Sequence, residues 1–155
     1  MIFKIPTALR QEHQELHREL DKALKSGGRI TPAAKELARI LHPHFEKEEA
    51  FVLPPLGLLL PLMQGQAAPE MKDFIPLAER VYSDFSGLLE DHLHVRAALK
   101  HLVDEALDEN RPEFVLFAAR LAEHARVEEE VFYPASWMVG EYLKARAPVW
   151  STKET

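Results

Sequence analysis

The sequence predicts an all-α protein, an up-down antiparallel four-helix bundle built as one domain. Apolar residues recur at helical spacing over four stretches, the links are short at two of the three joints, and the second half repeats the pattern of the first. A chain of 155 residues is long enough to form one hydrophobic core without disulfides. We therefore expect a single domain over residues 1–155, with the bundle at about 7–133 and a short helix and tail at 134–155.

The first two helices have clear boundary signals. The first spans Thr7 to about Lys25 and stops at a Ser-Gly-Gly sequence, which is a common helix end. Thr31 and Pro32 suit the cap and first turn of the second helix. Pro43 lies inside the apolar pattern of this helix, so it predicts a kink just before His44.

A connection rich in proline and leucine follows from Leu53 to Pro69. Its apolar part is short for a membrane span and is interrupted by prolines and a glycine. We expect most of its leucines to pack beneath the domain. The alternative is an exposed apolar surface through which the chain forms a homo-oligomer.

The third helix begins between Pro69 and Pro76 and ends at Asn110-Arg111-Pro112, where the fourth helix begins. The fourth helix is expected to stop at Pro134. A last amphipathic segment, Trp137 to Arg146, is expected to pack across one end of the bundle.

One local pattern occurs twice in the chain. It is His44-Phe45-Glu46-Lys47-Glu48-Glu49-Ala50-Phe51-Val52-Leu53-Pro54 in the first half and the stretch 124–134 in the second. In each copy a glutamate follows the histidine by four residues and a proline follows it by ten. Four residues of helix rise about 6 Å and turn by roughly 40°, so the histidine and glutamate share one face. This spacing is typical of metal ligands.

A lone histidine precedes each copy at nearly the same distance. His13 lies 31 residues before His44, and His92 lies 32 residues before His124. Six ionisable residues therefore fall on apolar seams of four different helices: His13, His44, Glu48, His92, His124 and Glu128. A buried, unpaired carboxylate costs several kcal/mol, so these groups need a partner.

Two explanations account for the six residues. Each histidine can be a hydrogen-bonded core residue, or the whole set can be a metal-free cluster of ion pairs. The repeated arrangement on all four seams favours a metal site instead. The chain has no cysteine, so the ligands must be nitrogen and oxygen atoms, a donor set suited to iron, manganese or zinc, and two bridging glutamates suit a pair of metals.

These motifs resemble the hemerythrin family, and specifically its bacterial branch of HHE cation-binding domains, over the chain from His13 to Pro134. The resemblance implies a hemerythrin-like bundle with a non-haem di-iron centre. It also implies that Glu48 and Glu128 bridge two Fe ions, with histidines as terminal ligands and an oxo or hydroxo group as a further bridge.

The sequence departs from the oxygen-carrying members of that family at two positions. On the third helix, Arg96 stands where those members have a second histidine. On the fourth helix, their last carboxylate is an aspartate five residues after the histidine, whereas Glu128 follows His124 by four. His17, four residues after His13, is the symmetry counterpart of the missing histidine, and we expect it to be a fifth histidine ligand; a hydrogen-bonded histidine at the edge of the seam is the alternative. Glu129 has the aspartate's spacing and is an alternative to Glu128.

The remaining candidates are expected to lie outside the centre. Helical geometry turns His42, His94 and His101 away from the seams. Glu49 and Glu130 are expected in solvent or behind the ligands. Glu12 and Asp91 could orient the ligands, but a plain surface role is favoured.

Composition excludes several partners. The net charge is −6 and the basic residues are dispersed, so neither nucleic acid nor a membrane surface is expected. The N-terminus lacks the pattern of a signal peptide, so a cytoplasmic location is expected.

With four histidines, two bridging carboxylates and a bridging oxygen, about one position per metal stays open, or one in total if His17 binds. The leading hypothesis is a di-iron protein that binds or senses a small diatomic ligand, which is dioxygen, or alternatively nitric oxide or peroxide. A di-iron oxidase, a peroxidase or a nitric oxide-handling enzyme is the second hypothesis, and an iron-handling domain without catalysis is the third. Binding is favoured over dedicated catalysis, and the catalytic reading stays open.

Overall fold

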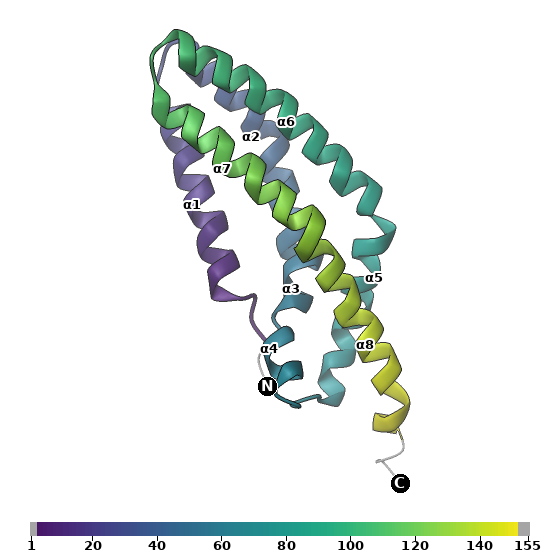
Figure 1. The fold of residues 1–155 in the computed structure, drawn as a ribbon. Helices are drawn as coiled ribbons and strands as arrows, with labels where there is room; N and C mark the ends of the chain where they lie inside the picture. Colours follow the sequence, from purple (N-terminus) through teal and green to yellow (C-terminus); the bar gives the residue numbers. More distant parts are fainter. Residues whose placement is uncertain (1–2, 152–155) are drawn as a thin grey trace.

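The structure is a computed structural model that describes residues 3–151, and within that range the chain is helical and contains no strand. The helices pack antiparallel in an elongated bundle (Figure 1), which confirms the predicted fold class. The beginning of the described chain and the end of α8 lie toward the same end of this rod.

Four helices form the half of the rod farther from the chain ends. Helix α2 packs against α1 and α6, and α7 closes the ring by packing against α6 and α1. These helices are α1 (Thr7–Leu24), α2 (Ile30–Lys47), α6 (Phe85–Asp108) and α7 (Pro112–Val127). Their core is a cluster of leucine, alanine and phenylalanine side chains from all four helices.

Within the part of the chain that the structure describes, the other half of the rod contains six short elements and the long helix α8. They are the π-helical turn η1 (Glu48–Val52), α3 (Leu53–Leu56), α4 (Leu59–Met63), the 3-10 helix η2 (Pro69–Phe74), α5 (Ile75–Ser83), the π-helical turn η3 (Glu128–Phe132) and α8 (Tyr133–Ser151). Helices α5 and α8 pack along each other, and α3 also contacts α8. The third predicted helix is thus divided at Asp84 into α5 and α6.

The predicted C-terminal segment was wrong in its start and in its packing. Helix α8 begins at Tyr133 and continues α7 through η3, and it runs along α5 instead of crossing an end of the bundle. Pro134 is tolerated because it lies in the first turn of α8, next to a wide π turn that already departs from regular α-helical hydrogen bonding. Pro43 likewise does not end α2, which continues through it to Lys47.

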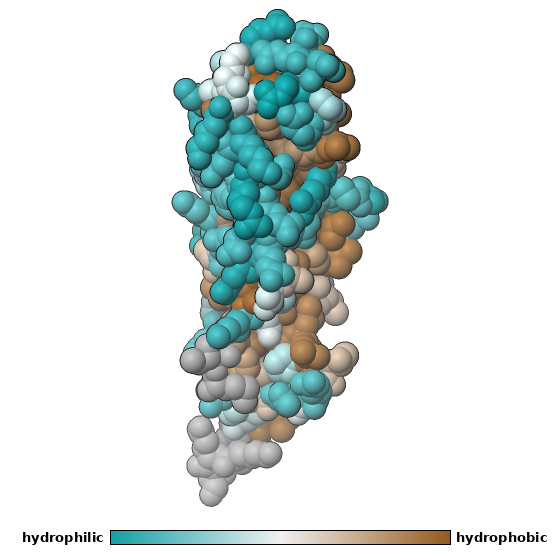
Figure 2. Space-filling view, turned by 90° about the vertical axis from the view of Figure 1, so that its left-hand side faces the viewer, coloured by the Kyte–Doolittle hydropathy of each residue, from teal (hydrophilic) through white to brown (hydrophobic). Residues whose placement is uncertain are grey.

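The leucine-rich connection divides into a buried part and an exposed part. Leu53, Leu56 and Leu58 are buried, whereas Leu60 and Met63 on α4 are 57% and 79% exposed. Figure 2 shows apolar residues along one edge and toward the lower end of the rod. Association through this surface stays a prediction. None of the helices in residues 3–151 has the length and apolar character needed to cross a membrane.

The ionisable residues of the seams lie where two core clusters meet. One cluster fills the bundle of α1, α2, α6 and α7, and the second gathers around η1, α3, α5 and Tyr133. Along α2 and η1, His44 lies between Leu41 of the first cluster and Phe51 of the second. His92 similarly lies between Leu88 and Val95 on α6.

Candidate metal centre

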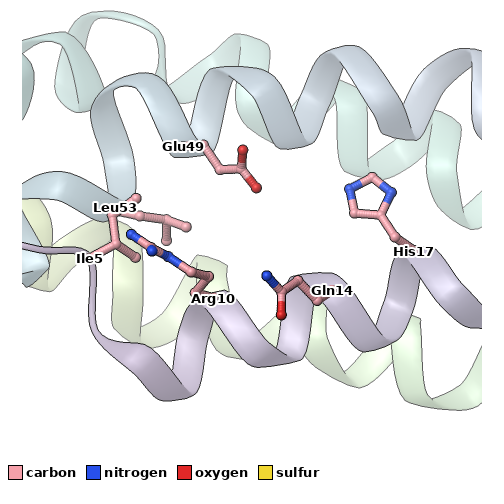
Figure 3. Close-up of a pocket in the computed structure, with 6 residues that line it drawn as sticks. All are labelled: Ile5, Arg10, Gln14, His17, Glu49 and Leu53. Carbon is pink, nitrogen blue, oxygen red and sulfur yellow. The ribbon is translucent and has the colours of Figure 1, made fainter.

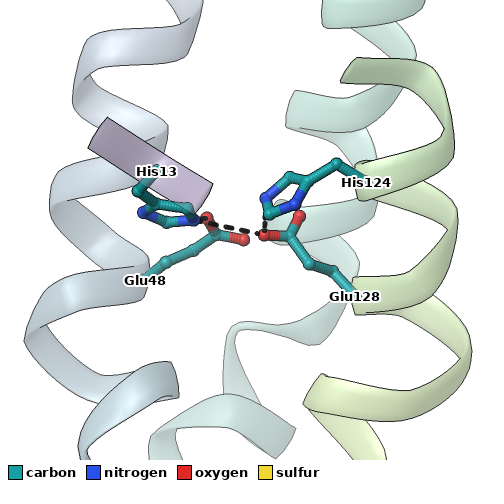
Figure 4. A group of neighbouring side chains, drawn as sticks. All are labelled: His13, Glu48, His124 and Glu128. Atoms are coloured by element: carbon teal, nitrogen blue, oxygen red, sulfur yellow. Dashed lines mark ion pairs between the residues drawn. The ribbon is translucent and has the colours of Figure 1, made fainter. Parts of the chain in front are cut away.

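The structure brings six of the seven predicted ligands together at the middle of the rod. They form two groups, one of His13, Glu48, His124 and Glu128, and one of His44, Glu48, His92 and Glu128. Within each group the potential ligand atoms lie within 4.8 Å of one another, and all six residues are buried. Figure 4 shows the first group with its side chains converging from α1, η1, α7 and η3.

Both glutamates belong to both groups, so the centre is binuclear in its layout. His13 Nε2 lies 3.4 Å from Glu48 Oε2 and 3.5 Å from Glu128 Oε1. On the other side, His44 Nε2 lies 3.1 Å from Glu48 Oε1, and His92 Nε2 lies 3.2 Å from Glu128 Oε2. Each carboxylate thus presents one oxygen to each pair of histidines. This arrangement suits two metal ions held side by side.

A π-helical turn starts at each shared glutamate. The N–H of Leu53 donates to the carbonyl of Glu48, and the N–H of Tyr133 donates to the carbonyl of Glu128, each spanning five residues. Pro54 and Pro134 follow these positions and cannot donate a backbone hydrogen bond, which accounts for a wide turn at the same place in both halves. Such turns are frequent at functional sites.

A carboxylate lies behind each of the four histidines. Asp91 Oδ2 is 3.1 Å from His44 Nδ1, and Glu129 Oε1 is 2.8 Å from His92 Nδ1. In the other group, Glu49 Oε1 is 3.5 Å from His13 Nδ1, and Glu12 Oε1 is 3.2 Å from His124 Nδ1.

Three of these carboxylates, those of Asp91, Glu129 and Glu49, are hydrogen-bonded to Nδ1 and direct the Nε2 atom of the same ring toward the centre, as carboxylates behind metal-binding histidines do. The contact between Glu12 and His124 is close but lacks hydrogen-bonding geometry. The favoured surface role for Asp91 was therefore wrong, whereas Glu12 lies beside His124 without a hydrogen bond to it. Glu129 lies outside the groups, and Glu128 occupies the shared position.

Arg96 binds the carboxylate of Glu129, which lies behind His92, and does not contact the centre itself. Its guanidinium donates to Glu129 Oε1 at 2.8 Å, and Lys47 donates to Asp91 Oδ2 at 2.7 Å. Both cations are on the side of His44 and His92. Within residues 3–151, neither Glu49 nor Glu12 forms an ion pair with a lysine or arginine. The two halves of the centre therefore differ in charge.

Several ionisable groups at the centre have pKa values shifted from their ordinary ones. Burial disfavours a charge on His44, yet its contacts with Glu48 and Asp91 raise its pKa from 6.5 to about 9. The pKa of His124 rises to about 9 in the same way, against its burial, through contact with Glu128. Burial and the charge of Glu128 raise the pKa of Glu48. The pKa of Glu128, despite its burial, is held well below its ordinary value by His124, His13 and His92.

Several buried polar atoms at the centre lack a hydrogen-bond partner, and they indicate whether the residues suit a metal ion. At the centre these include His13 Nε2, Glu48 Oε2, Glu128 Oε1 and His124 Nε2, one from each member of the first group. His124 Nε2 is 2.6 Å from Glu128 Oε1, but the pair lacks hydrogen-bonding geometry. Such atoms are costly to bury unless a ligand satisfies them. The residues therefore fit a bound cation.

One residue of the centre, Tyr133, has no counterpart in the sequence-based prediction. Its hydroxyl donates to Glu48 Oε1 at 2.5 Å and lies 3.2 Å from His92 Nε2, and its ring stacks on that of His92 with the centroids 5.7 Å apart. Burial and the charges of Glu48 and Glu128 raise its pKa far above the ordinary value, so the phenol keeps its proton. On a regular helix Tyr133 would point about 140° away from Glu128. Pro54 and Pro134, which occur at the same place in both halves and accompany the wide turns, were the only feature of the sequence that could have indicated this position of Tyr133.

The structure places His17 outside both groups. It lies one turn from His13 on α1, half-buried, with its ring 4.9 Å from that of Phe45 and 5.4 Å from that of His42. Burial and the nearby His42 lower its pKa. His42, His94 and His101 are exposed, as predicted.

The fold and the geometry together define a helical-bundle protein with a buried binuclear His/Glu metal site. The chain belongs to the hemerythrin family, because residues 4–136 match the model of the hemerythrin HHE cation-binding domain. Searches of curated proteins and of solved structures found no match to the chain.

Proposed function

We propose that the centre holds two iron ions and that the protein binds or senses a small diatomic ligand, with dioxygen as the leading candidate and nitric oxide or peroxide as alternatives. The observation that carries this proposal is the pair of buried His/Glu groups that share Glu48 and Glu128. Two Fe(II) ions, when bound, would supply two electrons and open coordination positions to such a ligand.

The residues of the chain have separate parts in this proposal. His13 and His124 would hold one metal and His44 and His92 the other, while Glu48 and Glu128 contribute an oxygen to each. The carboxylates hydrogen-bonded to His13, His44 and His92 keep the Nε2 atoms of these three histidines directed inward. The apolar side chains of the two adjoining core clusters exclude bulk water. A cytoplasmic location remains a prediction.

A catalytic role is the second candidate, and Tyr133 is the observation that favours it. A buried phenol that keeps its proton and lies 3.2 Å from His92 Nε2 can donate a hydrogen bond to a reacting group at the centre. An oxidase, a peroxidase or a nitric oxide-handling enzyme would use such a donor. Sustained turnover of peroxide or nitric oxide distinguishes this role from binding.

The first experiment is the metal content of protein purified without oxygen, followed by absorption spectra before and after oxygen is added. Two irons per chain and a visible band that disappears on degassing support reversible binding. Two irons with irreversible oxidation support the catalytic role, and no iron in a folded chain overturns the proposal.

A pair of variants on α6 controls the metal measurement. His92→Leu removes a buried member of the second group, whereas His94→Leu changes an exposed histidine two residues away. We expect His92→Leu to lose at least one iron per chain and His94→Leu to keep two. Equal iron content in both variants would contradict the assignment of His92.

A further inference from the structure

The two sides of the centre are closed by different residues. Leu53 and Tyr133 occupy equivalent positions in the two halves, since each comes five residues after a shared glutamate, at the end of a π turn and before a proline. Tyr133 lies over the group that contains His44 and His92. By the same internal symmetry, Leu53 belongs to the side of His13 and His124, where it offers no hydroxyl.

Tyr133 fills its side of the centre. Its side chain is 1% exposed, its hydroxyl touches both His44 and His92, and it is hydrogen-bonded to Glu48. Among the described residues, no side-chain nitrogen or oxygen of His44, His92 or Tyr133 is buried without a partner. This side has little room for a further ligand.

The opposite side is polar and lies next to a pocket. The four inward-facing atoms without a hydrogen-bond partner belong to the group of His13, Glu48, His124 and Glu128, and in the proposed function they hold the metal of this side. A pocket of about 280 Å³ lies between α1 and η1, lined by Ile5, Arg10, Gln14, His17, Glu49 and Leu53 (Figure 3). Glu49 separates it from the centre, because Glu49 Oε1 in its wall is 3.5 Å from His13 Nδ1.

The walls of the pocket suit a small polar or anionic molecule. Arg10, Gln14 and His17 bring donors from α1, and the figure shows them on the side of the pocket opposite Glu49. Its volume is ample for a molecule of two or three heavy atoms. His17 thus has a place in the wall one turn outward from His13.

We propose that small ligands reach the centre through this pocket and bind on the side of His13 and His124, and that Tyr133 keeps the side of His44 and His92 closed. The proposal rests on the proposed function, since it assumes that the centre is loaded with metal. It adds which side is open and which residues line the route, and it predicts that one ligand binds per pair of metals.

Azide is the probe, because its binding to a ferric centre gives a new absorption band. The iron-loaded, oxidised protein is mixed with azide in a stopped-flow instrument, and the rate and the number of azides bound are measured. Gln14→Trp places a large side chain at the exposed rim of the pocket, and Gln11→Trp makes the same change on α1 outside the pocket lining. We expect Gln14→Trp to slow azide binding at least tenfold and Gln11→Trp to leave the rate unchanged, with two irons in both.

A second pair of variants exchanges the two sides. Leu53→Tyr copies the closed side onto the open one and should lower azide affinity at least tenfold with two irons retained. Tyr133→Leu should allow a second azide per pair of irons. Unchanged azide binding in both Gln14→Trp and Leu53→Tyr would overturn the route while leaving the di-iron proposal intact. A wild-type chain that takes up no iron would overturn both.

Discussion

Asp91 and His44 lie on different helices, yet the carboxylate of Asp91 is 3.1 Å from His44 Nδ1 and only 2.7 Å from the amine of Lys47. The carboxylate fixes the ring so that Nε2 points at Glu48. Burial opposes the charge on Asp91, but its contacts with Lys47 and His44 lower its pKa. An ionised acceptor behind a histidine raises the basicity of the ligand atom.

Replacement of Asp91 should therefore weaken metal binding without unfolding the bundle. We expect Asp91→Asn to reduce affinity for the metal bound through His44 by about 10- to 100-fold. Competition with a chromophoric chelator measures the affinity, and Glu90→Gln, an exposed neighbour on α6, is the matched control. Equal affinities for the two variants would show that Asp91 has no orienting role.

Metal affinity should rise with pH. His44 and His124 in the metal-free protein have pKa values of about 9, so a metal ion bound near pH 7 must displace their protons. Each displaced proton changes the apparent affinity by about tenfold per pH unit. Zn²⁺ titrations from pH 6.5 to 9 should follow this slope for up to two protons. A flat profile would contradict the raised pKa values.

The stability of the metal-free protein should change with pH in the opposite direction. The pKa values of His44 and His124 are raised on folding, so their stabilising contribution is complete below pH 6.5 and is lost as pH rises through about 9. We expect urea unfolding to show a loss on the order of a few kcal/mol between pH 6.5 and 9.5. Stability that increases over this range would rule out a protonated centre.

Glu48 should cost stability when no metal is bound. Burial and the charge of Glu128 raise its pKa, so its ionised form is disfavoured in the folded chain. Glu48→Gln keeps an oxygen for the hydroxyl of Tyr133 and should stabilise the metal-free protein by on the order of 1 kcal/mol at pH 8. The same variant should fail to hold two metals. Glu49→Gln, which changes an exposed glutamate, should alter the free energy of unfolding by less than about 0.5 kcal/mol.

The positions of the four histidines at the centre could be predicted because they lie on regular helices. On a regular helix the spacing of residues determines which of them share a buried face. These histidines are His13, His44, His92 and His124. Periodicity could not place Tyr133, since the π turn after Glu128 rotates it onto the centre. Periodicity also could not show that α8 continues α7. Pro134 was expected to end the helix, whereas in the structure the helix continues past it through a wide π turn. The partners of Glu12 and Asp91 are on other helices, so their contacts depend on packing that a single sequence does not reveal.

The paired π turns also determine how the chain responds to insertions and deletions. Each wide turn holds one residue more than a regular α-helix, so the helix beyond it is out of phase by about 100°. Deletion of one residue between Glu48 and Leu53 would restore a regular helix and turn the buried faces of η1 and α3 away from α5 and α8. The π turns η1 and η3 therefore determine which faces of α3 and α8 are buried in the half of the rod that contains α5.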